Sequence, residues 1–182
     1  MQGAPVGKFI NNETTKGGIN MIDYPRYKKV LFCTDFSKLS DCAFDYAFGI
    51  AKRDDGVLYI LHVIPMTPRE YHLEHQLEPY LRREDLDKIK ATLQEEREKM
   101  FNDKYLNHIK DKTKVRIVTE SGREDEKIFE FVKKEKIDII VIGTHGRTGI
   151  DHVFLGSVAE KIIRRSPIPV FVIPCMDRPG PT

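Results

Sequence analysis

Two glycine-containing segments are the part of this sequence whose residue types could do chemistry. The segment 143–147, Gly-Thr-His-Gly-Arg, leaves an apolar run, and nine residues separate Gly146 from Gly156-Ser157, which stands at the start of a helical pattern. Glycine permits positive φ and lets a ligand approach the backbone closely. Free N–H groups at a helix start, at the positive end of the helix dipole, favour an anion. The spacing therefore predicts a phosphate site, hence a nucleotide; the alternative is a plain strand-to-helix connection with turn glycines.

Short apolar runs alternate along the chain with patterns of helical period. The apolar runs predict strands at 30–33, 57–64, 115–118, 137–142 and 170–173. The helical patterns predict helices at 37–52, at 83–109, from 121 or 122 onward, and at 157–165. Strands that alternate with helices imply an α/β fold, an open five-stranded parallel sheet with helices on both faces.

Local signals also suggest where the helices begin and which faces they bury. Ser37 or Ser40 is expected to cap the first helix, and Ser121 or Gly122 to open the third. The third helix is expected to pack through Ile128, Phe129 and Val132. An apolar stripe is expected along the long second helix at Leu86, Ile89, Leu93, Met100 and Leu106.

The candidate site residues follow the ends of several predicted strands. Asp35 follows the first strand, Val63 closes the second and Gly143 closes the fourth. Ligands of open α/β sheets bind beyond the carboxyl ends of the strands, where the strand order reverses. We therefore expect these three residues to gather at one edge of the sheet.

The pattern Gly143-x2-Gly146-x9-Gly156-Ser157 resembles the signature of the ATP-binding branch of the universal stress protein family. Segments 30–51, 58–64 and 137–174 are also similar to that family, and the resemblance spans roughly residues 27–174. It implies a flavodoxin-like or Rossmann-like adenine-nucleotide-binding domain that usually dimerises. One departure is Cys33, which stands where many members have proline before the Thr-Asp pair, and it leaves the local backbone shape open.

The resemblance implies an ATP site whose residues divide by the part of the nucleotide they face, with Mg²⁺ or Mn²⁺ carried on the phosphates. On the adenosine side it places Thr34, Asp35, Val63, Ile142 and Gly143. Around the phosphates it places His145, Gly146, Arg147, Gly156, Ser157 and Val158. Taken singly, Asp35 could instead cap the first helix, Val63 could be plain core, His145 could simply hold its loop, and Arg147 could equally be solvated.

The function implied is that of an ATP-binding stress-response regulator that works by binding, through a change of conformation or of a dimer surface. The resemblance also implies a homodimer formed through the strand at 170–173. A slow ATPase is the first alternative, with His145 and Asp35 as the nearby candidates for a base, although neither has an evident partner. An interaction module with an unused nucleotide site is the second. His72 and His75 have helical metal-ligand spacing, but surface positions are the better interpretation.

Composition limits the remaining function classes. The 182 residues fit one domain, expected at 25–175, with a flexible extension at 1–24 and a tail at 176–182; Met21 is an alternative start. A net charge of +2 gives no support to nucleic-acid binding, and no apolar stretch is long enough to span a membrane. Three cysteines, an odd number without a C-x-x-C pair, indicate a reducing compartment, hence the cytoplasm.

Overall fold

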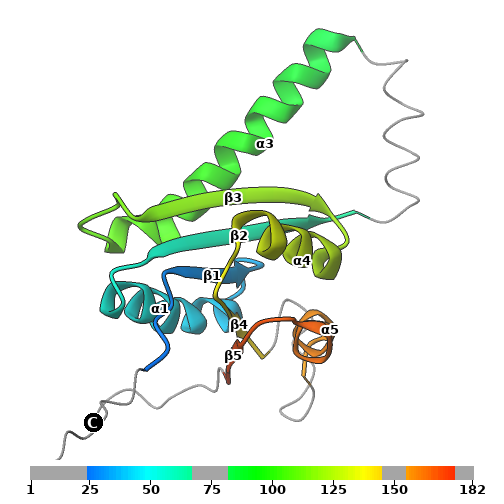
Figure 1. Cartoon of the computed structure of the whole chain (residues 1–182). Coiled ribbons are helices and arrows are strands. Elements are labelled where there is room, and N and C mark those ends of the chain that lie inside the picture. The colour runs from blue at the N-terminus through cyan, green and yellow to red at the C-terminus, as the bar shows by residue number, and fades with distance from the viewer. Residues whose placement is uncertain (1–23, 67–81, 145–154, 175–182) are drawn as a thin grey trace, which may run out of the picture.

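A five-stranded, all-parallel sheet forms the centre of the molecule (Figure 1). The computed structural model describes residues 24–66, 82–144 and 155–174. The strand order is β3-β2-β1-β4-β5, which confirms the predicted α/β class. The strands are β1 (Lys29–Thr34), β2 (Val57–Pro65), β3 (Val115–Gly122), β4 (Ile139–Gly143) and β5 (Val170–Ile173).

Helices cover both faces of this sheet, so each face has its own hydrophobic core. Alternate residues of β1 enter different cores: Val30 and Phe32 pack on one face, Leu31 and Cys33 on the other. The first face is covered by α1 and the carboxyl end of α3, and the second by α4 and α5. The helices are α1 (Lys38–Arg53), α3 (Arg83–Lys104), α4 (Glu124–Glu135) and α5 (Ser157–Arg165), with a 3₁₀ turn at Leu106–His108.

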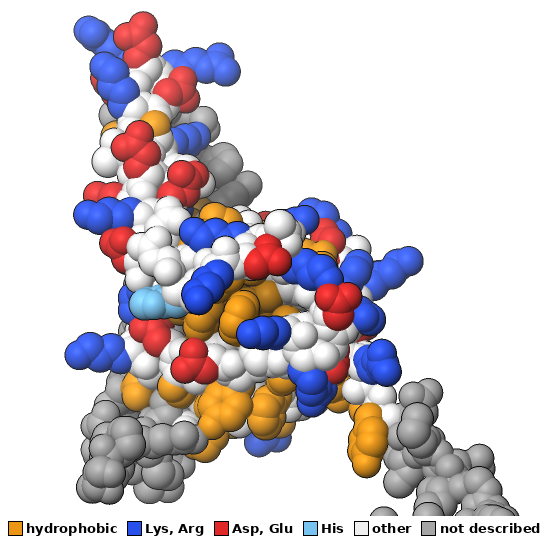
Figure 2. All heavy atoms as spheres, turned by 90° about the vertical axis from the view of Figure 1, so that its left-hand side faces the viewer, with side chains coloured by type: hydrophobic (Ala, Val, Ile, Leu, Met, Phe, Trp, Pro, Cys, Tyr) orange, Lys and Arg blue, Asp and Glu red, His pale blue; other side chains and the backbone are white. Residues whose placement is uncertain are grey.

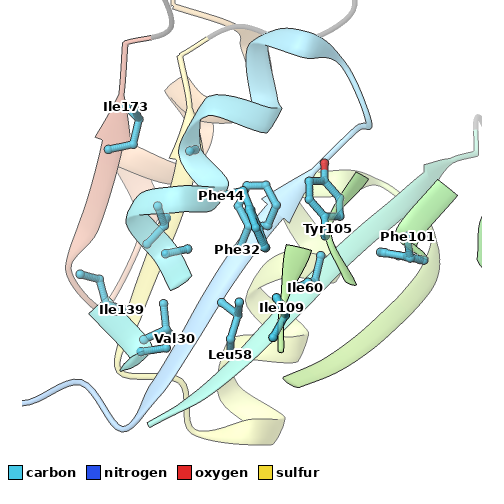
Figure 3. Packing of buried hydrophobic residues seen from close by; sticks show 14 of the residues in the cluster. Val30, Phe32, Phe44, Leu58, Ile60, Phe101, Tyr105, Ile109, Ile139 and Ile173 are labelled. Carbon is cyan, nitrogen blue, oxygen red and sulfur yellow. The ribbon is translucent and has the colours of Figure 1, made fainter. Parts of the chain in front are cut away.

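Helix α3 projects away from the sheet, and Figure 2 shows charged side chains of both signs along it. The expected apolar stripe is wrong as a core face at Ile89 and Leu93, which are 52% and 45% exposed, whereas Met100 and Leu106 are partly buried against the core. The buried anchors are Phe101 and Tyr105 at its end and Ile109 just beyond (Figure 3). The prediction of one helix to residue 109 is also wrong, since α3 ends at Lys104 and gives way to the 3₁₀ turn.

The boundary between β3 and α4 differs from the sequence expectation. Neither Ser121 nor Gly122 opens the helix, because β3 runs on beside β2, with Gly122 in register with Pro65. Gly122 ends the strand at φ 139°, a conformation that favours glycine, and α4 begins at Glu124. Along α4, Ile128 and Val132 are buried as expected, and Phe129 is partly buried and packs against the same core; Phe131, which was not expected, is fully buried there.

The reversal of strand order lies between β1 and β4, which pair with each other although β2 and β3 come between them in sequence. Both strands are buried along almost their whole length. Their carboxyl ends lead to the turn before α1 and toward α5, so the switch point is framed by two helix starts. Among the described residues, no helix is both long and apolar enough to cross a membrane.

Candidate functional site: a cavity at the carboxyl edge of the sheet

A cavity of about 320 Å³ opens at this switch point. It is bordered by the ends of β1, β2 and β4 and by the first turns of α1, α4 and α5. Ligand pockets usually start near this volume and combine an apolar lining with a few polar groups. The lining residues are Cys33, Thr34, Asp35, Ser40, Leu61, His62, Val63, Pro65, Glu124, Ile128, Ile142, Gly143, Thr144, Gly156, Ser157, Val158 and Ala159.

The structure brings most of the predicted site residues together at this cavity. Three of them, His145, Gly146 and Arg147, lie outside the described residues. The other eight line it from four separate segments of the chain: Thr34, Asp35, Val63, Ile142, Gly143, Gly156, Ser157 and Val158.

The turn after β1 is held by its own side chains. The Asp35 carboxylate accepts a hydrogen bond from the Ser37 N–H at 3.0 Å, and Ser37 in turn caps α1 by accepting from the Ser40 N–H. Asp35 is therefore not the cap of α1. Phe36, which lies between Asp35 and Ser37, adopts φ 61°, a costly conformation for a bulky residue. The centroid of its buried ring lies 4.4 Å from the centroid of the His62 ring. Burial of this ring fixes the strained turn at the cavity wall.

A chain of hydrogen bonds connects the cavity wall to the base of α3. The Thr34 hydroxyl accepts from the Phe36 N–H at 2.9 Å and lies 2.6 Å from the Tyr105 hydroxyl. Tyr105 donates to Asp41 at 2.6 Å, and the same carboxylate pairs with Lys104. Burial, and then the bond to Asp41, raises the pKa of Tyr105 far above its ordinary value, so the phenol stays protonated as a donor. The wall formed by β1 and α1 is thus tied to α3.

The first turn of α5 presents backbone N–H groups at the opposite side of the cavity. The Gly156 N–H is already used, because it donates to the Thr144 carbonyl at 2.7 Å. The first helical bond is donated by Glu160 to the Gly156 carbonyl, so the N–H groups of residues 157–159 precede the helical ladder. Gly156 is extended, with φ −59° and ψ 146°, and so is not a positive-φ glycine. This helix start has the donors and the dipole that suit an anion.

Gly143 serves a different purpose from the one its motif suggests. A Cβ at this position would lie 2.8 Å from the Leu39 carbonyl oxygen and 3.3 Å from the Ser40 Cα. These are backbone atoms of the α1 region and cannot move cheaply. Gly143 therefore allows α1 to approach β4, and close approach of a ligand is not needed to explain it.

Cys33 takes an ordinary strand conformation where a proline was expected from the resemblance. It pairs in register with Leu61 on one side and Ile142 on the other, inside β1. Burial raises the pKa of its thiol to about 12, so the thiolate that a nucleophile would need is not formed at neutral pH.

A buried carboxylate joins the two helices on the second face of the sheet. The Asp125 side chain is 1% exposed and lies 3.0 Å from Arg165, 3.2 Å from Arg123 and 3.6 Å from Lys161. Burial by itself would raise the pKa of Asp125, but the charges of Lys161 and Arg123 outweigh it and hold that pKa below its usual value. Because Lys161 and Arg165 belong to α5, the cluster fixes the start of α4 beside α5.

Sequence reasoning missed several lining residues. Ser40 and His62 give no signal in the sequence, because hydroxyls at helix starts and single histidines in cores are common. The fold brings both residues to the cavity wall. Glu124 is an acidic residue in the first turn of α4, and the spacing Glu124-x3-Ile128 was the available signal that both residues lie on one face of that helix.

Metal-binding clusters are absent from the part of the chain that the structure describes, where no three His, Cys, Asp or Glu side chains converge. The histidines at 72 and 75 lie outside it.

A protein-family model and two relatives match most of this chain. The family model described as "Universal stress protein family" matches residues 26–174. Universal stress protein MJ0531 of Methanocaldococcus jannaschii is 32% identical over 174 residues, covering 91% of this chain and 89% of that protein. Universal stress protein MJ0577 of the same organism is 35% identical over 159 residues, covering 81% and 94%.

Solved structures show the same fold. The structure of MJ0577, reported as a structure-based assignment of biochemical function, has a TM-score of 0.64 at 27% identity and covers 85% of this chain and 100% of that one. A universal stress protein in complex with cAMP has a TM-score of 0.51 at 23% identity and covers 82% and 98%; at this identity the likeness concerns the fold alone.

Proposed function

The chain belongs to the universal stress protein family, and on that premise we propose that it is an ATP-binding regulator of the stress response. One observation carries the proposal: Asp35, Val63 and the start of α5 border a single cavity at the switch point of the sheet. The cavity offers an apolar end beside β2 and a backbone-donor end beside α5. A nucleotide has the same division between its base and its phosphates.

We assign the parts of ATP to the cavity by chemistry. The base lies among Val63, Pro65 and Ile128, where apolar surface favours a flat aromatic ring. The ribose lies near Asp35, whose carboxylate can accept from its hydroxyls. The phosphates lie at the N–H groups of Ser157 and Val158, with residues 145–147 as further contacts from the motif.

Mg²⁺ or Mn²⁺ accompanies the nucleotide in this proposal. The described residues supply no cluster of three ligands, so the fit is to an ion held mainly by phosphate oxygens and water, with Ser157 the described hydroxyl at that end. Its part is to neutralise phosphate charge at the α5 end.

The protein acts by binding, without turnover. A ligand shifts a protein between two states only by its differential affinity for them. Here ATP contacts segments from β1, β2, α4 and α5 at once, so its binding favours the arrangement in which all four converge. The readout is a change in conformation or in a dimer surface.

Calorimetry with Mg-ATP, together with mass spectrometry of any small molecule released on denaturation, tests the proposal. Binding at micromolar to millimolar ATP supports it, and no binding at millimolar ATP refutes it and leaves an interaction module with an unused site. Steady ADP release at several turnovers per second would instead establish an ATPase.

The dimer belongs to the same proposal. β5 is an edge strand, and Phe171 on it is 42% exposed and packs edge-to-face with Tyr46 at 5.9 Å. An open apolar edge favours pairing with another strand, and a second copy supplies one. Light scattering should give twice the 21.1 kDa chain mass for the natural sequence and a monomer for Phe171→Glu. We also propose a cytoplasmic location, which rests on the free, buried thiol of Cys33.

A further inference from the structure

Three acidic residues begin α4, and only one of them faces the cavity. Asp125 is buried against the cations of α5, and Glu126 pairs with Arg123 at 2.8 Å. Glu124 lines the cavity, one helical turn before Ile128, which lines it too. The neighbouring residues of the first turn are thus held by ion pairs, while Glu124 points toward a prospective ligand.

The carboxylate of Glu124 has no partner of its own within the described residues. Arg123, the adjacent cation, is engaged by Asp125 and Glu126. No hydrogen bond or ion pair joins the Glu124 side chain to any residue of the described segments, and the side chain is only partly exposed. A half-buried acceptor at a cavity rim therefore remains for a donor brought by the ligand.

The position of Glu124 in the fold decides which end of a nucleotide it meets. Gly122 pairs in register with Pro65, and the Met66 N–H donates to the Gly122 carbonyl at 3.2 Å. Glu124 therefore lies beside the end of β2, in the same lining as Val63 and Pro65. A carboxylate there repels phosphates, which keeps them at the α5 end and leaves the base at the end occupied by Glu124.

We infer that Glu124 determines base preference by accepting a hydrogen bond from the 6-amino group of adenine. This inference rests on the proposed nucleotide site. An ionised carboxylate only accepts hydrogen bonds. Adenine presents an N–H donor at its 6 position, whereas guanine presents an oxygen acceptor there. Glu124 therefore attracts a 6-aminopurine nucleotide and repels a 6-oxopurine nucleotide.

The test compares ATP with GTP in calorimetric titrations of the full chain, all with the same Mg²⁺ concentration. The natural protein should prefer ATP. Glu124→Gln should lower the ratio of ATP to GTP affinity by about tenfold or more, because the amide can donate to the guanine oxygen. Glu124→Ala, which removes the repulsion but adds no donor, should weaken ATP and strengthen GTP less than Glu124→Gln does.

Glu126→Gln is the matched control, since it removes the same charge from the same helix turn without facing the cavity. Its ATP to GTP ratio should stay within about twofold of the natural value. ATP binding without preference, or an unchanged ratio in Glu124→Gln and Glu124→Ala, overturns the role of Glu124 and leaves the nucleotide site standing. Failure of the natural protein to bind either nucleotide overturns the site and this inference together. Circular dichroism establishes that each variant is folded.

Discussion

The two helical walls of the cavity are held together by different physics. On the α1 and α3 side, Thr34 and Tyr105 join a buried hydrogen-bond network packed among aromatic rings. On the α4 and α5 side, a buried Asp125 is surrounded by cations that are about half exposed. The first wall depends on packing and shape, whereas the second depends on charge. The stability that the first wall contributes should fall when a buried side chain is truncated, and the stability that the second contributes should depend on pH and salt.

The largest effect is expected from truncation in the first wall. Tyr105→Ala removes a side chain that is 1% exposed and contacts Phe32, Phe44 and Phe36. We expect a loss of about 3–5 kcal/mol in the free energy of unfolding, from the cavity left behind and the orphaned Asp41 bond. Urea denaturation measures it. Tyr24→Ala, at a 76% exposed tyrosine, is the control and should cost far less. A similar loss in both variants would contradict the importance of this wall.

Gly156→Val tests where the two walls meet the ligand. The backbone angles at Gly156 are open to valine, so the protein should fold, while the branched side chain fills space at the start of α5. We expect ATP affinity to fall by about a hundredfold or more, since backbone approach to the phosphates is blocked. Gly49→Val in α1, where a Cβ meets nothing within 4 Å, should leave affinity unchanged. Unaltered affinity in Gly156→Val would place the phosphates elsewhere.

The second wall should show a smaller effect that depends on ionic strength. Asp125→Asn removes the shared charge between α4 and α5 but leaves its cations partly solvated. We expect a loss of about 1–2 kcal/mol at neutral pH, measured by urea denaturation, and a smaller loss at 1 M salt. Glu126→Gln, whose ion pair is exposed, should change stability by less than about 0.5 kcal/mol. Equal effects in the two variants would show that burial of Asp125 adds nothing.

The smallest effect is the pH dependence of this wall. The folded-state pKa of Asp125 lies below its ordinary value of 3.8, so its stabilisation is fully present above that value and is lost as pH falls through the lower folded pKa. Asp54 behaves similarly, its pKa lowered to about 2 by the hydrogen bonds from Arg53 and the Tyr27 N–H. Thermal melts between pH 2 and 5 should show a shallower slope in Asp125→Asn and in Asp54→Asn than in the natural protein. If either variant kept the pH dependence of the natural protein, its carboxylate would not be the cause of that dependence.

The alternation of strands and helices could be predicted because it is written in local patterns. Ser37 and the Asp55-Gly56 turn bound α1 through interactions a few residues long. The extension of β3 to Gly122 could not be predicted in this way, since it depends on the length of β2 beside it. The exposure of Ile89 and Leu93 was also beyond reach, because periodicity marks an apolar face without saying whether anything covers it.

The sequence by itself determined the α/β class and, through the ends of its predicted strands, the expectation that Asp35, Val63 and Gly143 gather at one edge of the sheet. Only the tertiary structure showed what individual residues at the cavity do. Gly143 admits the backbone of α1, and Glu124 reaches the cavity because β3 ends beside β2. The physical cause is that these contacts join segments far apart in the chain, where no local period or motif records which backbone or side chain will be the neighbour.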